Sequence, residues 1–262
     1  MSSIYDNILK SIAKGEKLLA VLIDPDKMEL TKVEGFIKKV NSSIATHIFV
    51  GGSEVADALT EALVLEIKKH TKLPVVLFPG DVSQITNKAD ALLFLSLISG
   101  RNPNYLIGKH VEAISKLRDS KLEVIPTGYI LIENGRETSV QKVTGTTPLK
   151  RGNVQHIVDT AKAGDLLGMK LMYLEAGSGA THPITGEIIS AVKQDIKVPL
   201  IVGGGIRTQQ QLQEAYHSGA DVVVIGTAFE NDESFFNQLN SHRLMDVSQK
   251  GKNNAGNFKI IN

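Results

Sequence analysis

Short apolar runs recur along the chain, and stretches with helical periodicity lie between them. The runs are rich in Val, Ile and Leu and show no clean alternation with polar residues. This pattern is typical of strands that are buried on both faces, as in a parallel sheet. Eight such runs occur, at residues 18–24, 47–52, 74–80, 91–98, 122–132, 171–177, 199–205 and 221–227.

Several of the intervening stretches carry signals of helix ends. Thr208 followed by Gln211 reads as a capping box that opens a helix ending at Gly219. Asn153 is a suitable cap for a helix that ends at Gly168. Further helices are predicted at about 104–118 and within 53–73.

The alternation of apolar runs and helical stretches continues along the chain without a break in composition. It predicts an α/β fold, a single (β/α)8 TIM barrel that is possibly modified. We expect one domain over residues 1–262. An open, doubly wound sheet is the alternative, but phosphate-type loops after the last two runs favour the barrel. Residues 133–152 are polar and basic without an apolar period, and we expect them to form a loop over the barrel mouth. From about residue 248 we expect a polar, mobile tail.

The composition narrows the class of protein without naming a function. Hydrophobic residues make up 42% of the 262 residues and charged residues 22%, as in a soluble globular protein. A formal net charge of +1 argues against a broad nucleic-acid-binding face. The absence of cysteine excludes disulfides, thiolate catalysis and cysteine-ligated metals. No signal peptide or bilayer-spanning run is evident, so we expect a cytoplasmic protein.

Glycine-rich loops follow the last two apolar runs, where barrels of this kind frequently bind phosphate. Gly204 and Gly205 lead into a capped helix, and Gly226 with Thr227 forms a second loop. Glycine lets backbone N–H groups approach a ligand, and helix N-termini favour negative charge. Glycines also serve simply to make tight turns. Two such loops, with a further glycine loop at 177–179, favour a phosphate pocket.

An aspartate ends the first apolar run, in the sequence LIDPDK. Asp24 either caps the following helix or acts as a ligand for a hard cation. A carboxylate and a hydroxyl, completed by water, suit Mg²⁺, which commonly bridges phosphate oxygens. Under the second interpretation Asp24 binds Mg²⁺ and Ser53, after the second run, supplies the hydroxyl.

A single acid, Glu175, interrupts the sixth apolar run just before a glycine loop. This carboxylate is either structural or a general base that takes a proton from a substrate hydroxyl, a role worth about 10²–10⁴ in rate. Tyr173 lies two residues earlier and shares the same face of the strand. In a barrel that face is the interior, where Tyr173 either lines a ligand pocket or fills the core.

The other titratable side chains give weaker signals. The seven histidines show no metal-ligand spacing such as HExxH, and only His182, just beyond a glycine loop, is of interest. Arg207 either contacts phosphate or pairs on its own helix. We expect a solvated basic loop, with contact to an anionic substrate as the alternative, at Lys142, Lys150 and Arg151.

Six motifs occur in order from the first run to the eighth: LIDPDK, FVGGS, LFPGD, YLEAGSGA, VGGGIRT and VIGTA. With this combination the chain closely resembles the geranylgeranylglyceryl phosphate synthase family, which also includes the bacterial PcrB-type heptaprenylglyceryl phosphate synthases. The resemblance implies a modified TIM barrel. It also implies transfer of a prenyl group from a prenyl diphosphate, with geranylgeranyl diphosphate as the expected donor, to the sn-3 hydroxyl of sn-glycerol 1-phosphate, with release of diphosphate.

The resemblance also assigns roles to residues. Asp24 and Ser53 match the Mg²⁺ ligands, and Glu175 matches the acid that activates the glycerol hydroxyl. Glycerol phosphate would contact Tyr173, Leu174, Glu175, Ala176, Gly177, Ser178, Gly179, Gly204, Gly205, Gly226 and Thr227. The family contains dimers and hexamers, so a homo-oligomer is expected. Because the product is a lipid, we also expect loose membrane contact without an anchor.

The prenyl tail needs an apolar groove across the barrel mouth. Phe78, Leu95 and Leu97 would line it, although the same side chains also suit an ordinary core. The chain has no tryptophan, so Tyr105 is the candidate for an aromatic gate. The tail length stays open, since the sequence does not show which side chain blocks the groove. Two rival interpretations are another phosphate-binding barrel enzyme, such as an isomerase or lyase, and a non-catalytic barrel that binds a phosphorylated ligand.

Overall fold

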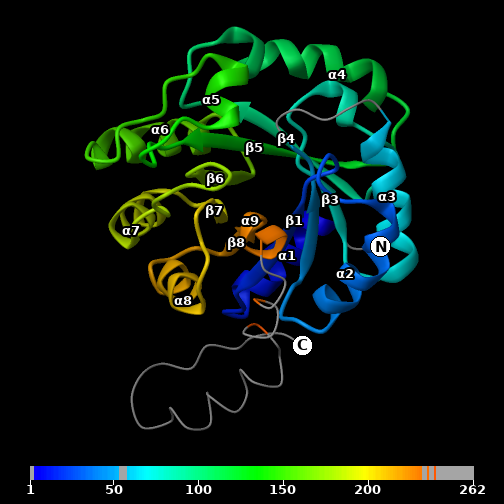
Figure 1. Cartoon of the computed structure of the whole chain (residues 1–262). Helices are drawn as coiled ribbons and strands as arrows, with labels where there is room; N and C mark the ends of the chain where they lie inside the picture. The colour runs from blue at the N-terminus through cyan, green and yellow to red at the C-terminus, as the bar shows by residue number, and fades with distance from the viewer. Residues whose placement is uncertain (1–2, 53–57, 232–234, 236–238, 240–262) are drawn as a thin grey trace, which may run out of the picture.

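The computed structural model describes residues 3–52, 58–231, 235 and 239, and its centre is a closed barrel of parallel strands (Figure 1). The strands follow one another around the barrel in chain order, and β1 pairs with β8 to close it. Every strand coincides with one of the apolar runs, which confirms the predicted TIM barrel. Their bounds are β1 Leu18–Ile23, β2 His47–Val50, β3 Val75–Leu77, β4 Ala91–Leu97, β5 Glu123–Leu131, β6 Leu171–Glu175, β7 Leu200–Gly203 and β8 Val222–Ile225.

Helices ring the barrel in Figure 1. They are α1 Ile4–Ala13, α2 Val33–Asn41, α3 Leu59–His70, α4 Lys109–Leu117, α5 Ser139–Thr144, α6 Val154–Leu166, α7 Gly186–Asp195, α8 Gln209–His217 and α9 Thr227–Asn231. Shorter turns are η1 Leu30–Lys32, η2 Val82–Gln84 and η3 Asn104–Gly108, the last of them a π-helical turn that leads into α4. In the part of the chain that the structure describes, no helix combines the length and apolarity needed to cross a bilayer.

The helix ends follow the predicted caps, with one difference. The side chains of Asn153 and Thr208 accept hydrogen bonds from the N–H groups of His156 and Gln211, and they begin α6 and α8. In a complete capping box the Gln211 side chain would bond back to its cap residue. It instead accepts from the backbone N–H of Arg207, at 2.8 Å. Thr208 therefore remains the cap, and only the return hydrogen bond is shifted by one residue, to Arg207 in the loop that precedes α8.

The connection between β3 and β4 departs from the regular alternation. Only the η2 turn stands where a barrel helix is expected, so the prediction of a helix after every strand is wrong at this position. β3 has three residues, and its ladder with β4 consists of two pairs, Val76 with Ala91 and Leu77 with Leu92. The ladder ends at Leu77 and Leu92, and the connection over residues 78–90, all of them described, contains no α-helix.

The segment 133–152 is more ordered than its polar sequence suggests. Thr138 caps the short helix α5 by accepting from the N–H of Gln141, and a β-bridge joins Ile132 to Leu149. The expectation of a loop without helical structure is therefore wrong over Ser139–Thr144. Val140 packs against the residues that fill the barrel interior, which anchors this segment over the mouth as predicted.

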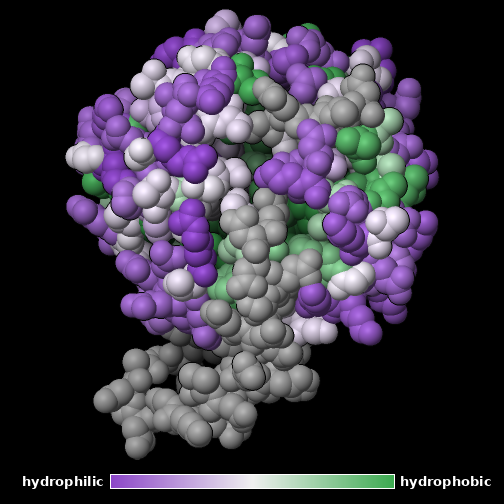
Figure 2. Space-filling model, viewed as in Figure 1, coloured by the Kyte–Doolittle hydropathy of each residue, from purple (hydrophilic) through white to green (hydrophobic). Residues whose placement is uncertain are grey.

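Alternation along each strand separates two apolar layers. One set of side chains fills the barrel interior, including Phe49, Leu93 and Tyr173. The other set packs between the strands and the surrounding helices, including Val50 and Leu174. Figure 2 shows hydrophilic residues over most of the rim and apolar ones toward the hollowed centre. The tail predicted from about residue 248 lies outside the described residues.

Candidate active site

A polar cavity opens at the carboxyl ends of the strands, the end at which TIM barrels place their active sites. It has a volume of about 940 Å³, including its open mouth. Most of the predicted site residues meet here although they come from four different strand ends. Those that line the cavity are Asp24, Tyr173, Glu175, Ser178, Gly179, Gly204, Gly205, Gly226 and Thr227.

β6 presents two functional side chains to the cavity and turns two away from it. Tyr173 and Glu175 point inward and line the cavity. Leu174 and Ala176 lie in the layer between the strands and the helices, because successive strand residues face opposite sides. The Ala176 N–H donates to Gly203, and its carbonyl accepts from the side chain of Asn134. Neither Leu174 nor Ala176 lines the cavity, so this arrangement does not support their predicted contact with glycerol phosphate, which stays a prediction.

Glu175 is 5% exposed, and its surroundings tune its protonation. Burial raises the pKa of its carboxyl to about 7, because the charged form loses hydration. Two hydrogen bonds oppose this shift by stabilising the carboxylate, from the Gly177 N–H and from the Tyr173 hydroxyl. A carboxyl with a pKa near neutrality is suited to general base catalysis. Gly177 does not line the cavity, and the structure gives it the role of holding Glu175.

The loop after β7 approaches Glu175 so closely that only glycine fits. Gly204 and Gly205 have φ of +83° and +75°, in the left-handed region that favours glycine. A Cβ on Gly204 would lie 2.5 Å from Glu175 Oε1 and 2.7 Å from the Gly177 nitrogen. The loop therefore places glycine backbone directly against the buried carboxylate.

The loops after β6 and β8 meet across the cavity. The hydroxyls of Ser178 and Thr227 lie 3.1 Å apart and share a hydrogen bond. Gly226 and Thr227 line the same wall as Gly204 and Gly205, at the ends of adjacent strands β7 and β8. Hydroxyls and glycine backbone gathered in this way suit a phosphate group.

Asp24 lines the cavity at the end of β1, the strand next to β8, and its side chain is 19% exposed. One carboxylate oxygen accepts from the Asp26 N–H at 3.2 Å, and the other lies 3.3 Å from Lys27 Nζ. Among the described residues there is no cluster of three or more His, Asp or Glu side chains that would hold a metal without help. A single carboxylate facing a polar cavity fits Mg²⁺, which keeps much of its water and binds phosphate oxygens. Ser53 lies outside the described residues.

Of the residues that the structure describes, two with cationic side chains line the cavity, Lys27 and Arg207. Arg207 also donates to the carbonyl of Ala180 at 2.6 Å, which joins the loop after β7 to the loop after β6. The predicted basic loop does not reach the cavity. Lys142 pairs with Glu137, Lys150 pairs with Glu133, and Arg151 donates to the carbonyls of Glu133, His182 and Pro183. His182 itself is exposed and does not line the cavity.

Tyr129 is a site residue that the sequence analysis missed. It is buried on β5, pairs in register with Tyr173 on β6, and its ring meets the Tyr173 ring edge-on at 5.3 Å. Burial, together with the charge of Glu175, raises the pKa of its hydroxyl well above the usual range, so the hydroxyl stays protonated. Aligning the fifth and sixth apolar runs as neighbouring strands would have placed the two tyrosines side by side.

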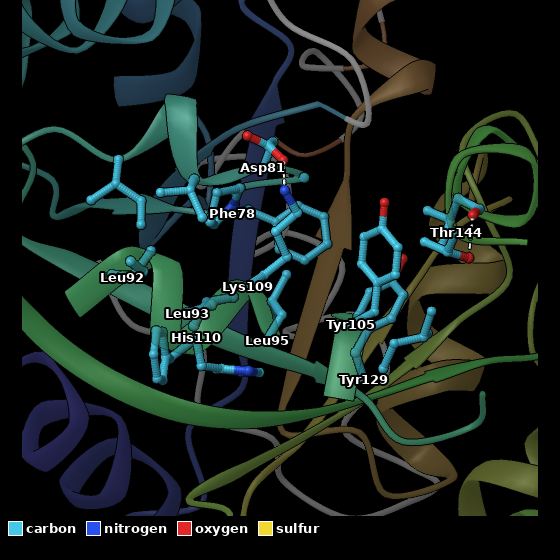
Figure 3. Close-up of a pocket in the computed structure, with 18 of the residues that line it drawn as sticks. Phe78, Asp81, Leu92, Leu93, Leu95, Tyr105, Lys109, His110, Tyr129 and Thr144 are labelled. Carbon is cyan, nitrogen blue, oxygen red and sulfur yellow. Dashed lines mark hydrogen bonds and ion pairs between the residues drawn. The ribbon is translucent and has the colours of Figure 1, made fainter. Parts of the chain in front are cut away.

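An apolar groove of about 850 Å³ adjoins the polar cavity (Figure 3). The predicted lining residues Phe78, Leu95 and Leu97 are all part of it, as is Tyr105, whose hydroxyl donates to the Val143 carbonyl at 3.3 Å. The groove and the cavity share a wall, formed by Gly52, Phe78, Tyr129 and Val140. A ligand with a charged head and an apolar tail can therefore occupy both compartments at once.

Solved structures with similar folds include geranylgeranylglyceryl phosphate synthases. The enzyme of Thermoplasma acidophilum in complex with sn-glycerol 1-phosphate has a TM-score of 0.86 and 30% identity, covering 92% of this chain and 96% of that one. A tryptophan synthase α-subunit from Pyrococcus furiosus, with a TM-score of 0.52 and 14% identity, shares the barrel fold alone.

Comparisons of the sequence point to the same family as the solved structures. The model of the PcrB family matches residues 11–243. A geranylgeranylglyceryl phosphate synthase from Flavobacterium johnsoniae is 54% identical over 236 residues, covering 90% of this chain and 97% of the relative. One from Pyrococcus abyssi is 41% identical over 229 residues, covering 87% and 90%. These matches confirm the resemblance seen in the motifs, and the chain belongs to the PcrB family of geranylgeranylglyceryl phosphate synthases.

Proposed function

We propose that this protein is a prenyltransferase that joins a prenyl diphosphate, geranylgeranyl diphosphate in the first instance, to the sn-3 hydroxyl of sn-glycerol 1-phosphate. The product is an ether-linked precursor of phospholipids, and diphosphate is released. One observation supports the proposal most strongly: a polar cavity and an apolar groove lie side by side and share a wall. The polar cavity holds Glu175, a buried acid with a pKa of about 7. An isomerase or lyase acting on a small phosphorylated substrate has no need for such a groove.

Glycerol phosphate binds in the polar cavity in this proposal. Its phosphate lies against the backbone of Gly204, Gly205 and Gly226, with the hydroxyls of Ser178 and Thr227 beside them. In this proposal the far hydroxyl points to Glu175, which lines the same cavity. Binding of the non-reacting phosphate thus positions the reacting alcohol, which is catalysis by proximity.

Asp24 would hold Mg²⁺ with the diphosphate of the donor, and Ser53 is the proposed second ligand. A bound Mg²⁺ supplies charge neutralisation that makes diphosphate a better leaving group. Lys27, beside Asp24 in the cavity wall, adds positive charge at the same place. The donor head group is thereby held at the β1 side of the cavity.

Glu175 accepts the proton in this proposal. In its ionised form it accepts the proton of the glycerol hydroxyl while the oxygen attacks the allylic carbon and the carbon–oxygen bond to diphosphate breaks. The Tyr173 hydroxyl and the Gly177 N–H stabilise the carboxylate before the reaction. Phe78 and Tyr129, whose rings lie 5.9 Å apart, line the shared wall and exclude water from the reacting carbon.

The prenyl tail occupies the apolar groove over Phe78 and Leu95. We further propose that the protein acts in the cytoplasm as a homo-oligomer, a dimer or hexamer, and contacts membranes loosely to exchange its lipid substrate and product. The formal net charge of +1 fits a protein that binds neither nucleic acid nor a strongly anionic surface.

Incubation with radiolabelled sn-glycerol 1-phosphate and geranylgeranyl diphosphate tests the proposal. We expect a solvent-extractable phosphorylated product that requires Mg²⁺ and disappears when EDTA is added. Equal release of diphosphate and product distinguishes transfer from hydrolysis. Binding of glycerol phosphate without product from any prenyl diphosphate would instead indicate a non-catalytic barrel.

A further inference from the structure

Asn134 is a buried polar side chain that lies beside the candidate active site but lines neither the cavity nor the groove. It follows the end of β5 by three residues and is 1% exposed. Its Oδ1 accepts from the Arg136 N–H at 3.1 Å, and its Nδ2 donates to the carbonyl of Ala176 in the loop after β6. The amide therefore has a donor on one side and an acceptor on the other, and it joins the ends of the neighbouring strands β5 and β6 (Figure 1).

One peptide group lies between Asn134 and the buried acid Glu175. The carbonyl of this peptide belongs to Ala176 and accepts from Asn134, and its N–H belongs to Gly177 and donates to the Glu175 carboxylate. A trans peptide is planar, with its carbonyl and its N–H pointing in opposite directions. Asn134 therefore holds one side of the peptide while Glu175 accepts from the other. Hydrogen bonds in such a series polarise one another, so the bond to Asn134 strengthens the donor that the carboxylate receives.

Glycine at position 177 leaves this peptide able to rotate unless a contact holds it. The φ of Gly177 is +100°, and glycine adopts φ of either sign about equally readily. Rotation by half a turn would remove the N–H from Glu175 and turn the Ala176 carbonyl oxygen toward the carboxylate. Asn134 opposes this rotation, because its buried amide would lose its acceptor, and a buried donor without a partner is costly.

The segment that carries Asn134 is itself held against the loop after β6. Thr138 is 3% exposed and caps α5, and a Cβ on Gly177 would collide with its methyl group. Arg136 Nη1 donates to the carbonyl of Gly179 at 3.3 Å. These contacts bring the two loops together, and the amide of Asn134 supplies the hydrogen bond to the peptide beside the acid.

We propose that Asn134 is a positioning residue that keeps the Gly177 N–H directed at the Glu175 carboxylate. It touches no substrate and acts through the peptide that it holds. The inference rests on the proposed function, in which Glu175 is the base, and adds a residue outside the cavity that controls this base. Without the amide the carboxyl stays buried but receives a weaker hydrogen bond, which disfavours its charged form and raises its pKa further.

The other titratable groups around Glu175 are unchanged when Asn134 is replaced. Tyr173 donates to the carboxylate from the same strand, and Tyr129 approaches from β5. Three charged side chains line the same cavity from the loops after β1 and β7: Asp24, Lys27 and Arg207. All five are common to the unaltered protein and the variant, so a difference in pH dependence reports the bond made by Asn134.

The test measures kcat/KM for glycerol phosphate at pH 6 and pH 9 in the unaltered protein and in Asn134→Leu, which has a similar size but no donor. Glu175 acts when ionised, so the ratio of the value at pH 9 to the value at pH 6 should rise about threefold or more in the variant. Both values come from one preparation, so a loss of folded protein cancels. Asn134→Ala carries the test if the leucine variant does not fold.

Asn102→Leu is the matched control, because Asn102 makes the same two kinds of hydrogen bond. Its Oδ1 accepts from the Asn104 N–H at 3.1 Å, and its Nδ2 donates to the Thr144 carbonyl at 2.9 Å, beside the groove and not at the loop after β6. The control should leave the pH ratio unchanged. A ratio that changes less than about twofold in the folded Asn134 variants, or that changes equally in Asn102→Leu, would overturn the inference.

A second measurement needs no turnover. Glu175→Gln removes the ionisation of the buried acid, so the increase in its relative stability between pH 5 and pH 8 reports the folded pKa of Glu175. Urea unfolding should show a larger increase in an Asn134→Leu background, because a higher folded pKa extends the pH window above 7. Equal increases in the two backgrounds would show that Asn134 does not act on Glu175, whether or not the unaltered protein forms product. Absence of product from the unaltered protein would instead refute the proposed function.

Discussion

The hydroxyl of Tyr173 donates a hydrogen bond to the carboxylate of Glu175, two residues further along the same strand. Both side chains are buried, and both point into the barrel because alternate strand residues share a face. The bond favours the ionised form of an acid that burial would otherwise keep protonated. Tyr173 thereby keeps Glu175 available as a base near neutral pH.

Replacing the base should leave binding largely intact and slow the reaction. Glu175→Gln preserves the size of the side chain but cannot accept a proton from the glycerol hydroxyl. We expect turnover at least tenfold lower, within the range of about 10²–10⁴ typical of a general base. Turnover is measured with both substrates saturating, and glycerol phosphate affinity by calorimetry. Unchanged turnover would refute the role of Glu175.

The pH dependence of the reaction should report the Tyr173–Glu175 bond. Glu175 acts when ionised, so kcat/KM should rise with pH and level off above a pKa of about 7. Tyr173→Phe removes a donor that stabilises the carboxylate, so the rising limb should move to higher pH. Substrate ionisation is common to both proteins and cancels in the comparison. A limb that stays in place or moves to lower pH would contradict the assignment.

The raised pKa of Glu175 also predicts how stability changes with pH. Its folded value of about 7 exceeds the ordinary value of 4.5, so between these values the unfolded chain ionises the group while the folded protein holds it protonated. Folding is therefore penalised increasingly as pH rises through this window. Relative to the unaltered protein, Glu175→Gln should gain stability from pH 4.5 to 7, by at most about 3 kcal/mol, and remain level above. Urea unfolding at pH 5 and pH 8 measures the difference.

Gly204→Ala should damage the site more than the fold. A Cβ there would lie 2.5 Å from Glu175 Oε1, in addition to the cost of a left-handed φ of +83°. Gly168→Ala is the matched control, because φ is +89° and nothing lies within 4 Å of its Cβ position. The control should lose about 1 kcal/mol of stability and keep its activity. Gly204→Ala should also lose glycerol phosphate affinity, measured by calorimetry. Equal behaviour of the two variants would contradict the close-approach argument.

Replacing Asp24 should weaken binding of the prenyl diphosphate and of Mg²⁺, and not binding of glycerol phosphate. Asp24→Asn removes the charge proposed to hold Mg²⁺, so the Mg²⁺ concentration for half-maximal rate and the KM for prenyl diphosphate should both rise at least tenfold. The KM for glycerol phosphate should change less, because Asp24 is proposed to hold the donor and not the acceptor. Steady-state kinetics over a Mg²⁺ titration measure all three. A change confined to the KM for glycerol phosphate would contradict the assignment.

Much of the barrel could be predicted because parallel strands buried on both faces give continuous apolar runs. The exceptions have local causes. The β3–β4 connection lacks a helix, since residues 78–90 contain Pro79, Gly80 and polar residues at positions where a helix needs an apolar stripe. Helix α5 was missed because it is too short for periodicity to reveal, although Thr138 is a suitable cap.

Site residues could be predicted where an acid or a glycine loop lies at the end of an apolar run. Glu175, Asp24 and the glycine loops follow the apolar runs directly, and a barrel brings such ends together. Leu174 and Ala176 were assigned from a motif without regard to the alternation of faces. The groove was predicted on its strand side, at Phe78, Leu95 and Leu97, but the part that α4 lines could not be, because it depends on where β3 and β4 stop pairing.

A crystal structure of the protein with bound sn-glycerol 1-phosphate tests the central claim most directly. We expect its phosphate oxygens within hydrogen-bond distance of the backbone N–H groups of the loops at Gly204–Gly205 and Gly226–Thr227. The terminal hydroxyl should lie about 3 Å from the Glu175 carboxylate. A phosphate bound away from both glycine loops, or a hydroxyl turned away from Glu175, would contradict the account.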